Sequence, residues 1–391
     1  MNFDFTSEQT QLADTVRRLV DKDYGFDTRK KIVMSEAGTS DAVWTQLVEL
    51  GLTALPVPEA QGGFDGTAVD LLLVMQELGR GLVAEPYFAT VFAAEFIKRG
   101  GSAAQRALLG GVADGSLKMA AALGESDSRH DLTHVAMKAE AAGDGYTLTG
   151  RKSVVLFGAQ ADQLIVSARI ATGDDGLALF VVDARTAGVT RKDLRTLDGQ
   201  RVAEIFFDHV ALDADALIAR GDAARELLDA AIDFGIALLC AEAVGVMEAM
   251  NAATLDYAKT RKQFGQPIAR FQVLQHRMVD MFMHLEQARS MAYLAAVKAD
   301  SSDALERRRT ASAAKVRVGQ AMRYIGQQAV QIHGGMGVTN ELPAAHLFKR
   351  LTMIELTLGD TDHHLQRFIA ASAVEPVSLA RPNVTPLQRA A

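Results

Sequence analysis

The chain has 391 residues, enough for two or three packed modules, each with a hydrophobic core of its own. Its formal net charge of −7 argues against a nucleic-acid partner, because a surface that follows phosphates needs clustered lysine and arginine. The single cysteine, Cys240, excludes an intrachain disulfide framework, and no secretory signal pattern follows Met1, so we expect a cytoplasmic protein. Because the chain is acidic overall, small acidic ligands would have to bind at local basic sites.

The first part of the chain has the apolar spacing of helices. Apolar residues recur every three or four positions from Ser7 onward, as in Leu71 and Met75. A glycine-rich loop at residues 62–66 interrupts the pattern. These features predict an N-terminal helical domain over residues 1–119.

After residue 120 the apolar pattern changes to alternation. Val135, Met137 and Ala139 alternate toward a Gly-Asp-Gly turn at residues 143–145, which is the pattern of a β-hairpin. Further short runs rich in β-branched and aromatic residues follow. We expect a small antiparallel β domain over residues 120–218.

Long stretches of helical spacing return in the last part of the chain. They cover roughly residues 223–260, 271–299 and 303–332, lengths that suit a C-terminal four-helix bundle over residues 219–375. The fold class predicted from these patterns is α+β and mainly α, with three domains. The tail at residues 376–391 contains three of the eight prolines, and we expect it to be extended.

The most apolar stretch, from Ala230 to Met247, has the composition of a buried helix. It contains Asp233 and Glu242 and is shorter than a membrane span. We therefore expect no membrane insertion.

Two segments of the predicted bundle carry a resemblance to a known family. Residues 261–265 read Arg-Lys-Gln-Phe-Gly, and residues 331–337 read Gln-Ile-His-Gly-Gly-Met-Gly. With the order of helices, β domain and bundle, they resemble the acyl-CoA dehydrogenase family from about Phe5 to about Phe368. The resemblance implies FAD between the β domain and the bundle, an acyl-CoA substrate, electron-transfer flavoprotein as a partner, and assembly as dimers or tetramers.

The resemblance also implies roles for individual residues of these segments. Arg261 would pair with the FAD pyrophosphate, because its planar fork of donors suits two phosphate oxygens. Phe264 would pack by the adenine, and Gln263 would bond the phosphates where the family often has threonine. Gln331, Gly334 and Gly335 would let backbone approach the adenosine closely. Two simpler interpretations stay open: Arg261 as a cation at a helix C-terminus, and the glycine pair as a helix stop.

Leu358 marks the main departure from the family. It stands where the family commonly has the glutamate that removes the proton α to the thioester, and leucine cannot accept a proton. A second family position for the base matches Gly235. Asp360 and Glu242 remain as candidate bases, although a helix cap at Asp360 and a paired core carboxylate at Glu242 are the simpler interpretations.

Other positions that serve the flavin ring in the family have also changed. The family's Trp-Ile-Thr strand reads Val-Val-Leu at residues 154–156, and its serine-containing loop keeps only Glu125 and Asp131. Thr361 could replace a lost family threonine after a shift of one residue. Asp360 and the two histidines at residues 363–364 could suggest a metal site. Adjacent histidines on a helix point about a quarter-turn apart, however, and no third or fourth ligand is placed, so we expect no metal.

The retained and lost positions fall into two sets. The retained set comprises the arginine, the phenylalanine and the Gln-x-x-Gly-Gly element, which in the family act across the subunit interface on a neighbour's flavin. The lost set comprises the base, the Trp-Ile-Thr strand and the serine-containing loop, which in the family serve the chain's own flavin. We therefore interpret the chain as the helper subunit of a heteromer that dehydrogenates an acyl- or dicarboxyl-CoA thioester, most similar to the small subunits of two-chain pimeloyl-CoA dehydrogenases. The alternatives are a self-sufficient homo-oligomer with a non-standard base and a non-catalytic flavoprotein.

Overall fold

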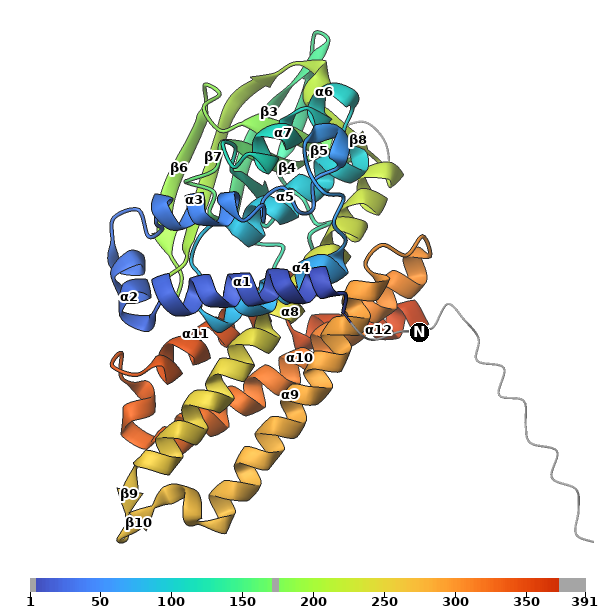
Figure 1. The fold of residues 1–391 in the computed structure, drawn as a ribbon. Coiled ribbons are helices and arrows are strands. Elements are labelled where there is room, and N and C mark those ends of the chain that lie inside the picture. The colour runs from blue at the N-terminus through green and yellow to red at the C-terminus, as the bar shows by residue number, and fades with distance from the viewer. Residues whose placement is uncertain (1–4, 171–175, 373–391) are drawn as a thin grey trace, which may run out of the picture.

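The computed structural model describes residues 5–170 and 176–372. Figure 1 shows a sheet at one end of the molecule and a bundle of long helices at the other, with N-terminal helices packed against the sheet and between the two. The predicted fold class is therefore confirmed: the chain is mainly helical, with a central β domain. The proline-containing tail that was expected to be extended lies outside the described residues.

The N-terminal part forms seven helices in the described range. Thr6 starts the first one with a capping box, in which its side chain and that of Gln9 each bond the other's backbone amide. The helices are α1 (Ser7–Asp23), α2 (Phe26–Met34), α3 (Asp41–Glu49), α4 (Ala68–Arg80), α5 (Tyr87–Gly100), α6 (Ala103–Arg106) and α7 (Leu108–Ala113).

The β domain is one eight-stranded sheet in the order β6-β7-β3-β2-β4-β5-β8, with β1 paired to β4. Most pairs are antiparallel as expected, but β1 and β2 both run parallel to β4. Between β2 and β4 the chain runs back along β3, so β2 and β4 point the same way, and a long connection over residues 123–137 returns the chain between β1 and β2. The strands are β1 (Met119–Ala122), β2 (Lys138–Ala142), β3 (Gly145–Leu156), β4 (Gln163–Ile170), β5 (Leu177–Asp183), β6 (Val189–Arg195), β7 (Arg201–Leu212) and β8 (Leu217–Arg220).

The C-terminal part is built on three long helices that pack against one another. Two shorter helices follow, and a small hairpin joins the first two long ones (Figure 1). The elements are α8 (Asp222–Thr260), β9 (Lys262–Gln263), β10 (Gln266–Pro267), α9 (Gln272–Lys298), α10 (Ala304–His333), α11 (Pro343–Leu356) and α12 (Thr361–Ser372).

Helix α8 is long and apolar enough to cross a membrane, but it is the central helix of the fold. In its most apolar window 94% of the residues are buried inside the structure. It packs against α4 on one side and against α9, α10 and α11 on others. The helix is therefore buried core, as its composition predicts.

Candidate functional site

The two segments predicted to bind the adenosine end of FAD come together at the end of the bundle away from the sheet. A hollow of about 620 Å³, which we call the hairpin hollow, lies between the β9–β10 turn and the end of α10. Six residues that sequence analysis assigned to cofactor binding line it. They are Arg261, Gln263, Phe264, Gln331, Gly334 and Gly335.

The backbone of the hairpin turns Phe264 outward. Phe264 and Gly265 both have positive φ, 51° and 78°, and the phenylalanine side chain is 90% exposed. Gly334 also has positive φ, and a Cβ at Gly334 or Gly335 would meet no atom within 4 Å. The two glycines thus leave open space beside the hollow.

The hollow is positively charged, although the chain as a whole is acidic. Arg261 and Arg277 both line it, and its described lining contains neither aspartate nor glutamate. Neither arginine forms a salt bridge with a described residue. Two uncompensated guanidinium groups favour an anionic ligand.

Aromatic groups complete the lining of the hairpin hollow. The rings of Tyr257 and His333 stack at a centroid distance of 4.4 Å, and the Tyr257 hydroxyl donates to the His333 carbonyl oxygen at 3.2 Å. Burial lowers the pKa of His333, so its ring is neutral at pH 7. The exposed ring of Phe264 beside guanidinium groups and bare glycine backbone suits the adenosine diphosphate end of a dinucleotide, so the residues present fit FAD here.

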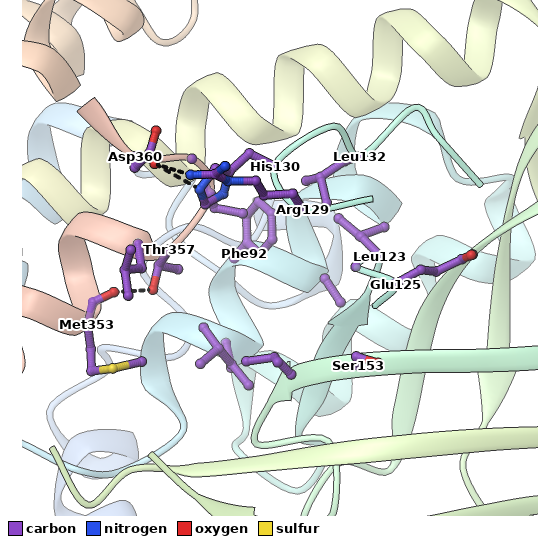
Figure 2. A pocket seen from close by; sticks show the side chains of 18 of the residues that line it. Phe92, Leu123, Glu125, Arg129, His130, Leu132, Ser153, Met353, Thr357 and Asp360 are labelled. Carbon is purple, nitrogen blue, oxygen red and sulfur yellow. Dashed lines mark hydrogen bonds and ion pairs between the residues drawn. The ribbon is translucent and has the colours of Figure 1, made fainter. Parts of the chain in front are cut away.

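A second hollow, which we call the central cavity, lies between the sheet and the bundle. It has a volume of about 630 Å³, and its wall combines α5, the end of β1, the loop after β1, β3 and the segment from α11 to α12. Figure 2 shows Asp360, His130 and Arg129 grouped at one edge with Leu132 beside them, and Phe92 and Leu123 below this group. Most of the wall is apolar.

Leu358, at the usual position of the base, lines the central cavity. Its φ of 56° is unusual for a residue with a side chain. A Cβ at Gly235, the second family position for the base, would lie 2.8 Å from Leu358 Cδ1. The two positions are therefore neighbours in space, and neither carries a proton acceptor.

Lys315 holds the loop that carries Leu358. Its side chain is fully buried in α10, and its Nζ donates to the carbonyl oxygens of Glu355 at 3.3 Å, Thr357 at 2.6 Å and Gly359 at 2.8 Å. Burial lowers the pKa of Lys315 to about 8. His364 adds a fourth contact, from its Nε2 to the Leu358 carbonyl oxygen at 2.8 Å. Sequence analysis missed Lys315, although a lysine on the apolar face of α10 was a visible signal.

Asp360 lines the central cavity beside Leu358, but its carboxylate is engaged. Oδ1 accepts from the His363 amide at 2.8 Å, which caps α12, and Oδ2 lies 3.2 Å from His130 Nε2 and 3.5 Å from Arg129 Nη2. Burial raises its pKa, but the amide and the neighbouring cationic groups outweigh this and hold the pKa of Asp360 below its ordinary value. A carboxylate stabilised in this way is a weak proton acceptor.

Glu242 does not line the central cavity and forms a buried ion pair. Its two oxygens accept from Arg350 Nε at 2.6 Å and Nη2 at 2.8 Å. Arg350 also donates to Asp198 at 2.9 Å and to Gln200 at 2.8 Å. This network joins α8, α11 and the turn between β6 and β7, which is the role of a paired core carboxylate.

Thr361 lines neither of the two hollows. Its hydroxyl donates to Glu355 Oε1 at 2.9 Å, and a Cβ at Gly319 would lie 2.3 Å from Thr361 Oγ1. The structure therefore does not bring Thr361 together with the other predicted cofactor residues. Its side chain faces α10 instead.

The sheet side of the central cavity offers an apolar surface where the family has aromatic and hydroxyl groups. Val154 sits at an irregularity of β3 with a φ of 54° and is 64% exposed, facing the cavity. Glu125 pairs with the buried Lys152 at 2.6 Å and accepts from the amides of Ala136 and Met137. The retained glutamate thus supports the loop after β1. Within the described residues, no group of three or more histidine, cysteine, aspartate or glutamate side chains could hold a metal ion.

Family models match the chain in three consecutive parts. Residues 6–116, 120–210 and 226–373 match the N-terminal, middle and C-terminal domains of acyl-CoA dehydrogenases, respectively. The fold and the two hollows define the class of FAD-dependent oxidoreductases. The chain belongs to the acyl-CoA dehydrogenase family.

Individual relatives agree with this assignment. The chain is 29% identical over 388 residues to the probable acyl-CoA dehydrogenase YngJ of Bacillus subtilis, covering 95% of this chain and 99% of the relative. It is 31% identical over 314 residues to the acyl-CoA dehydrogenase FadE12 of Mycobacterium tuberculosis, covering 78% and 80%. It also resembles a chain of the ChsE4-ChsE5 complex from Mycobacterium tuberculosis, with a TM-score of 0.87, 26% identity and coverage of 96% and 100%. The names of these relatives do not point to the pimeloyl-CoA subgroup.

Proposed function

We propose that this chain is the helper subunit of a heteromeric, FAD-dependent acyl-CoA dehydrogenase. Its hairpin hollow binds one end of a flavin that is held mainly by a partner subunit. The partner's carboxylate removes the α proton of an acyl- or dicarboxyl-CoA thioester. Bound FAD supplies the hydride acceptor for the β hydrogen. This chain's own residues bind and orient the adenosine end.

The distance between the two hollows supports one part of this proposal, that the flavin is shared between subunits. Gly235 lies beside the central cavity and Arg261 lies in the hairpin hollow, 26 residues further along the same helical stretch. At about 1.5 Å per residue, the two sites are roughly 40 Å apart along α8. Figure 1 likewise places the β9–β10 hairpin at the end of the bundle away from the sheet. One FAD molecule cannot reach from one hollow to the other, so the hairpin hollow serves a flavin of another subunit.

The state of the central cavity supports the helper role. Leu358 and Gly235 leave both base positions without a carboxylate, and Asp360 is tied to Arg129 and His130 (Figure 2). This ion pair joins the loop after β1 to the start of α12.

The partner would be a base-containing member of the same family. The ChsE4-ChsE5 complex is a two-component structure with the same fold, and we extend the comparison to the two-chain pimeloyl-CoA dehydrogenases and to electron-transfer flavoprotein as electron acceptor. We propose domains at residues 1–119, 120–218 and 219–375, and a dimeric or tetrameric assembly. The buried free thiol of Cys240 is compatible with a reducing cytoplasm.

Flavin stoichiometry tests the proposal directly. The chain is purified alone and with a base-containing partner, FAD is quantified by absorbance, and each sample is titrated anaerobically with acyl-CoA. We expect little flavin in the chain alone, and in the pair one FAD for every two chains, bleached by substrate. One FAD per chain that acyl-CoA reduces in the isolated protein would contradict the helper role and return attention to Asp360 and Glu242.

The self-sufficient enzyme is the second candidate, because Asp360 does line the central cavity. It predicts flavin reduction by the isolated chain that is lost on Asp360→Asn. The non-catalytic flavoprotein predicts bound flavin that no acyl-CoA reduces, with or without a partner.

A further inference from the structure

The hairpin hollow contains a second guanidinium group that the sequence resemblance did not assign. Arg277 lies in the second turn of α9 and lines the hollow together with Arg261. Val273 is one turn earlier on α9 and lines the same hollow, so this face of the helix forms one of its walls.

The surroundings leave the Arg277 charge available for a ligand. The side chain is partly buried, and within residues 5–170 and 176–372 it forms no salt bridge. The described lining of the hollow supplies no carboxylate that could neutralise it. Partial burial without a countercharge is costly unless an anion binds.

We propose that Arg277 is a second phosphate-binding residue, so that this chain presents two guanidinium groups to an adenosine diphosphate moiety. The inference rests on the proposed function and adds a residue to it. Two arginines converging on one hollow match a diphosphate better than a single phosphate, because each can bond separate oxygens. FAD and coenzyme A both contain an adenosine diphosphate moiety, so both are tested.

The experiment measures ligand binding by the complex of this chain with its base-containing partner. The complex is stripped of flavin, and the Kd of FAD is measured by flavin fluorescence at low and high salt. We expect Arg277→Met to raise the Kd about ten-fold, the typical effect of losing one charge-assisted hydrogen bond. The ratio of mutant to wild-type Kd should fall at high salt, because salt screens the lost charge.

Two variants serve as controls. Arg270→Met removes an exposed arginine that does not line the hollow, and it should change the Kd less than two-fold. Arg277→Lys keeps the charge but not the planar fork, and its Kd should lie between those of the wild type and Arg277→Met. Secondary-structure content and the melting temperature of each variant show whether it is folded.

A parallel titration with coenzyme A distinguishes the two ligand sources. Weaker FAD binding in Arg277→Met identifies FAD as the ligand, and weaker coenzyme A binding with unchanged FAD binding identifies coenzyme A. Unchanged affinity for both would overturn the role of Arg277 while leaving the helper function intact. A wild-type complex that does not bind one FAD for every two chains would instead contradict the proposed function itself.

Discussion

Asp360 is the acidic residue nearest in sequence to Leu358, which stands at the usual position of the base. Its contacts decide whether it acts as a catalytic base or as a helix cap. It caps α12 through the His363 amide and faces Arg129 and His130. Every one of these contacts stabilises the ionised form, against the cost of burial. A base that accepts a proton during turnover needs the opposite balance, with a pKa nearer the working pH.

We predict that Asp360→Asn leaves the turnover of the heteromeric pair unchanged within about two-fold, because asparagine also caps helices and no proton is exchanged there. Asp360→Ala removes the cap and should lower the free energy of unfolding by about 1 kcal/mol. Steady-state kinetics and urea unfolding check the two parts. A large loss of turnover in the asparagine variant, with stability preserved, would favour Asp360 as base.

Lys315 shows how a buried charge can keep a loop in an unusual conformation. Its ammonium group bonds three carbonyl oxygens around Leu358, a residue whose positive φ is otherwise unfavourable. Removing these bonds would leave buried carbonyl groups without donors, each at a cost of about 1–3 kcal/mol. Lys315 thus stabilises the loop in this conformation.

The lowered pKa of Lys315 gives a pH-dependent stability with a defined sign. The folded chain releases this proton near pH 8, whereas an unfolded lysine keeps it to about pH 10.4. Between these values the unfolded state binds more protons, so the Lys315 contribution to the free energy of unfolding rises with pH. We predict that wild type gains stability relative to Lys315→Met from pH 8 to pH 10, measured by urea unfolding. The exposed-lysine variant Lys262→Met should show no such difference from wild type.

At the scale of elements, Arg350 connects parts of the fold that are distant in sequence. It lies on α11 and pairs with Glu242 on α8 and Asp198 in the β6–β7 turn, all three buried. The turn is further fixed to α2, because Arg29 donates to the Asp198 carbonyl oxygen at 2.9 Å. The sheet, the bundle and the N-terminal helices therefore meet at one buried polar network.

We predict that Arg350→Met lowers the free energy of unfolding by about 3–5 kcal/mol, because it leaves two buried carboxylates without their cation. Glu242→Gln should cost less, since Asp198 still balances Arg350, and the pair should keep its turnover. Chemical unfolding and steady-state assays measure both effects. Abolished turnover in Glu242→Gln at near-normal stability would instead identify Glu242 as a base.

At the scale of the whole molecule, periodicity and motif spacing predict more of the fold than of the site. The helical and alternating stretches became helices and strands, and residues 261–265 and 331–337 met at one hollow as the resemblance implied. Thr361 did not join the other predicted residues, because its side chain turns toward Gly319. Arg277 carries no local motif, since only the packing of α9 against α8 and α10 brings it to the hollow.

The bundle surface also predicts assembly. Helix α9 exposes Val279, Phe282 and Met283 at 56%, 58% and 49%, spaced so that they lie on one face. An apolar stripe of this kind on a long helix marks a protein interface. If the hairpin hollow serves a flavin of another subunit, as we propose, association is a condition for function.

We predict that Phe282→Asp reduces the molar mass of the assembly measured by sedimentation, because a carboxylate buried in an apolar interface is unfavourable. FAD content should fall with it, since the hairpin hollow then loses the subunit whose flavin it holds. The matched control is Leu197→Asp, which changes an exposed leucine in the β6–β7 turn that lies outside the bundle. A Phe282→Asp assembly with wild-type mass and flavin content would exclude α9 as the contact and place the subunit interface on another face of the bundle.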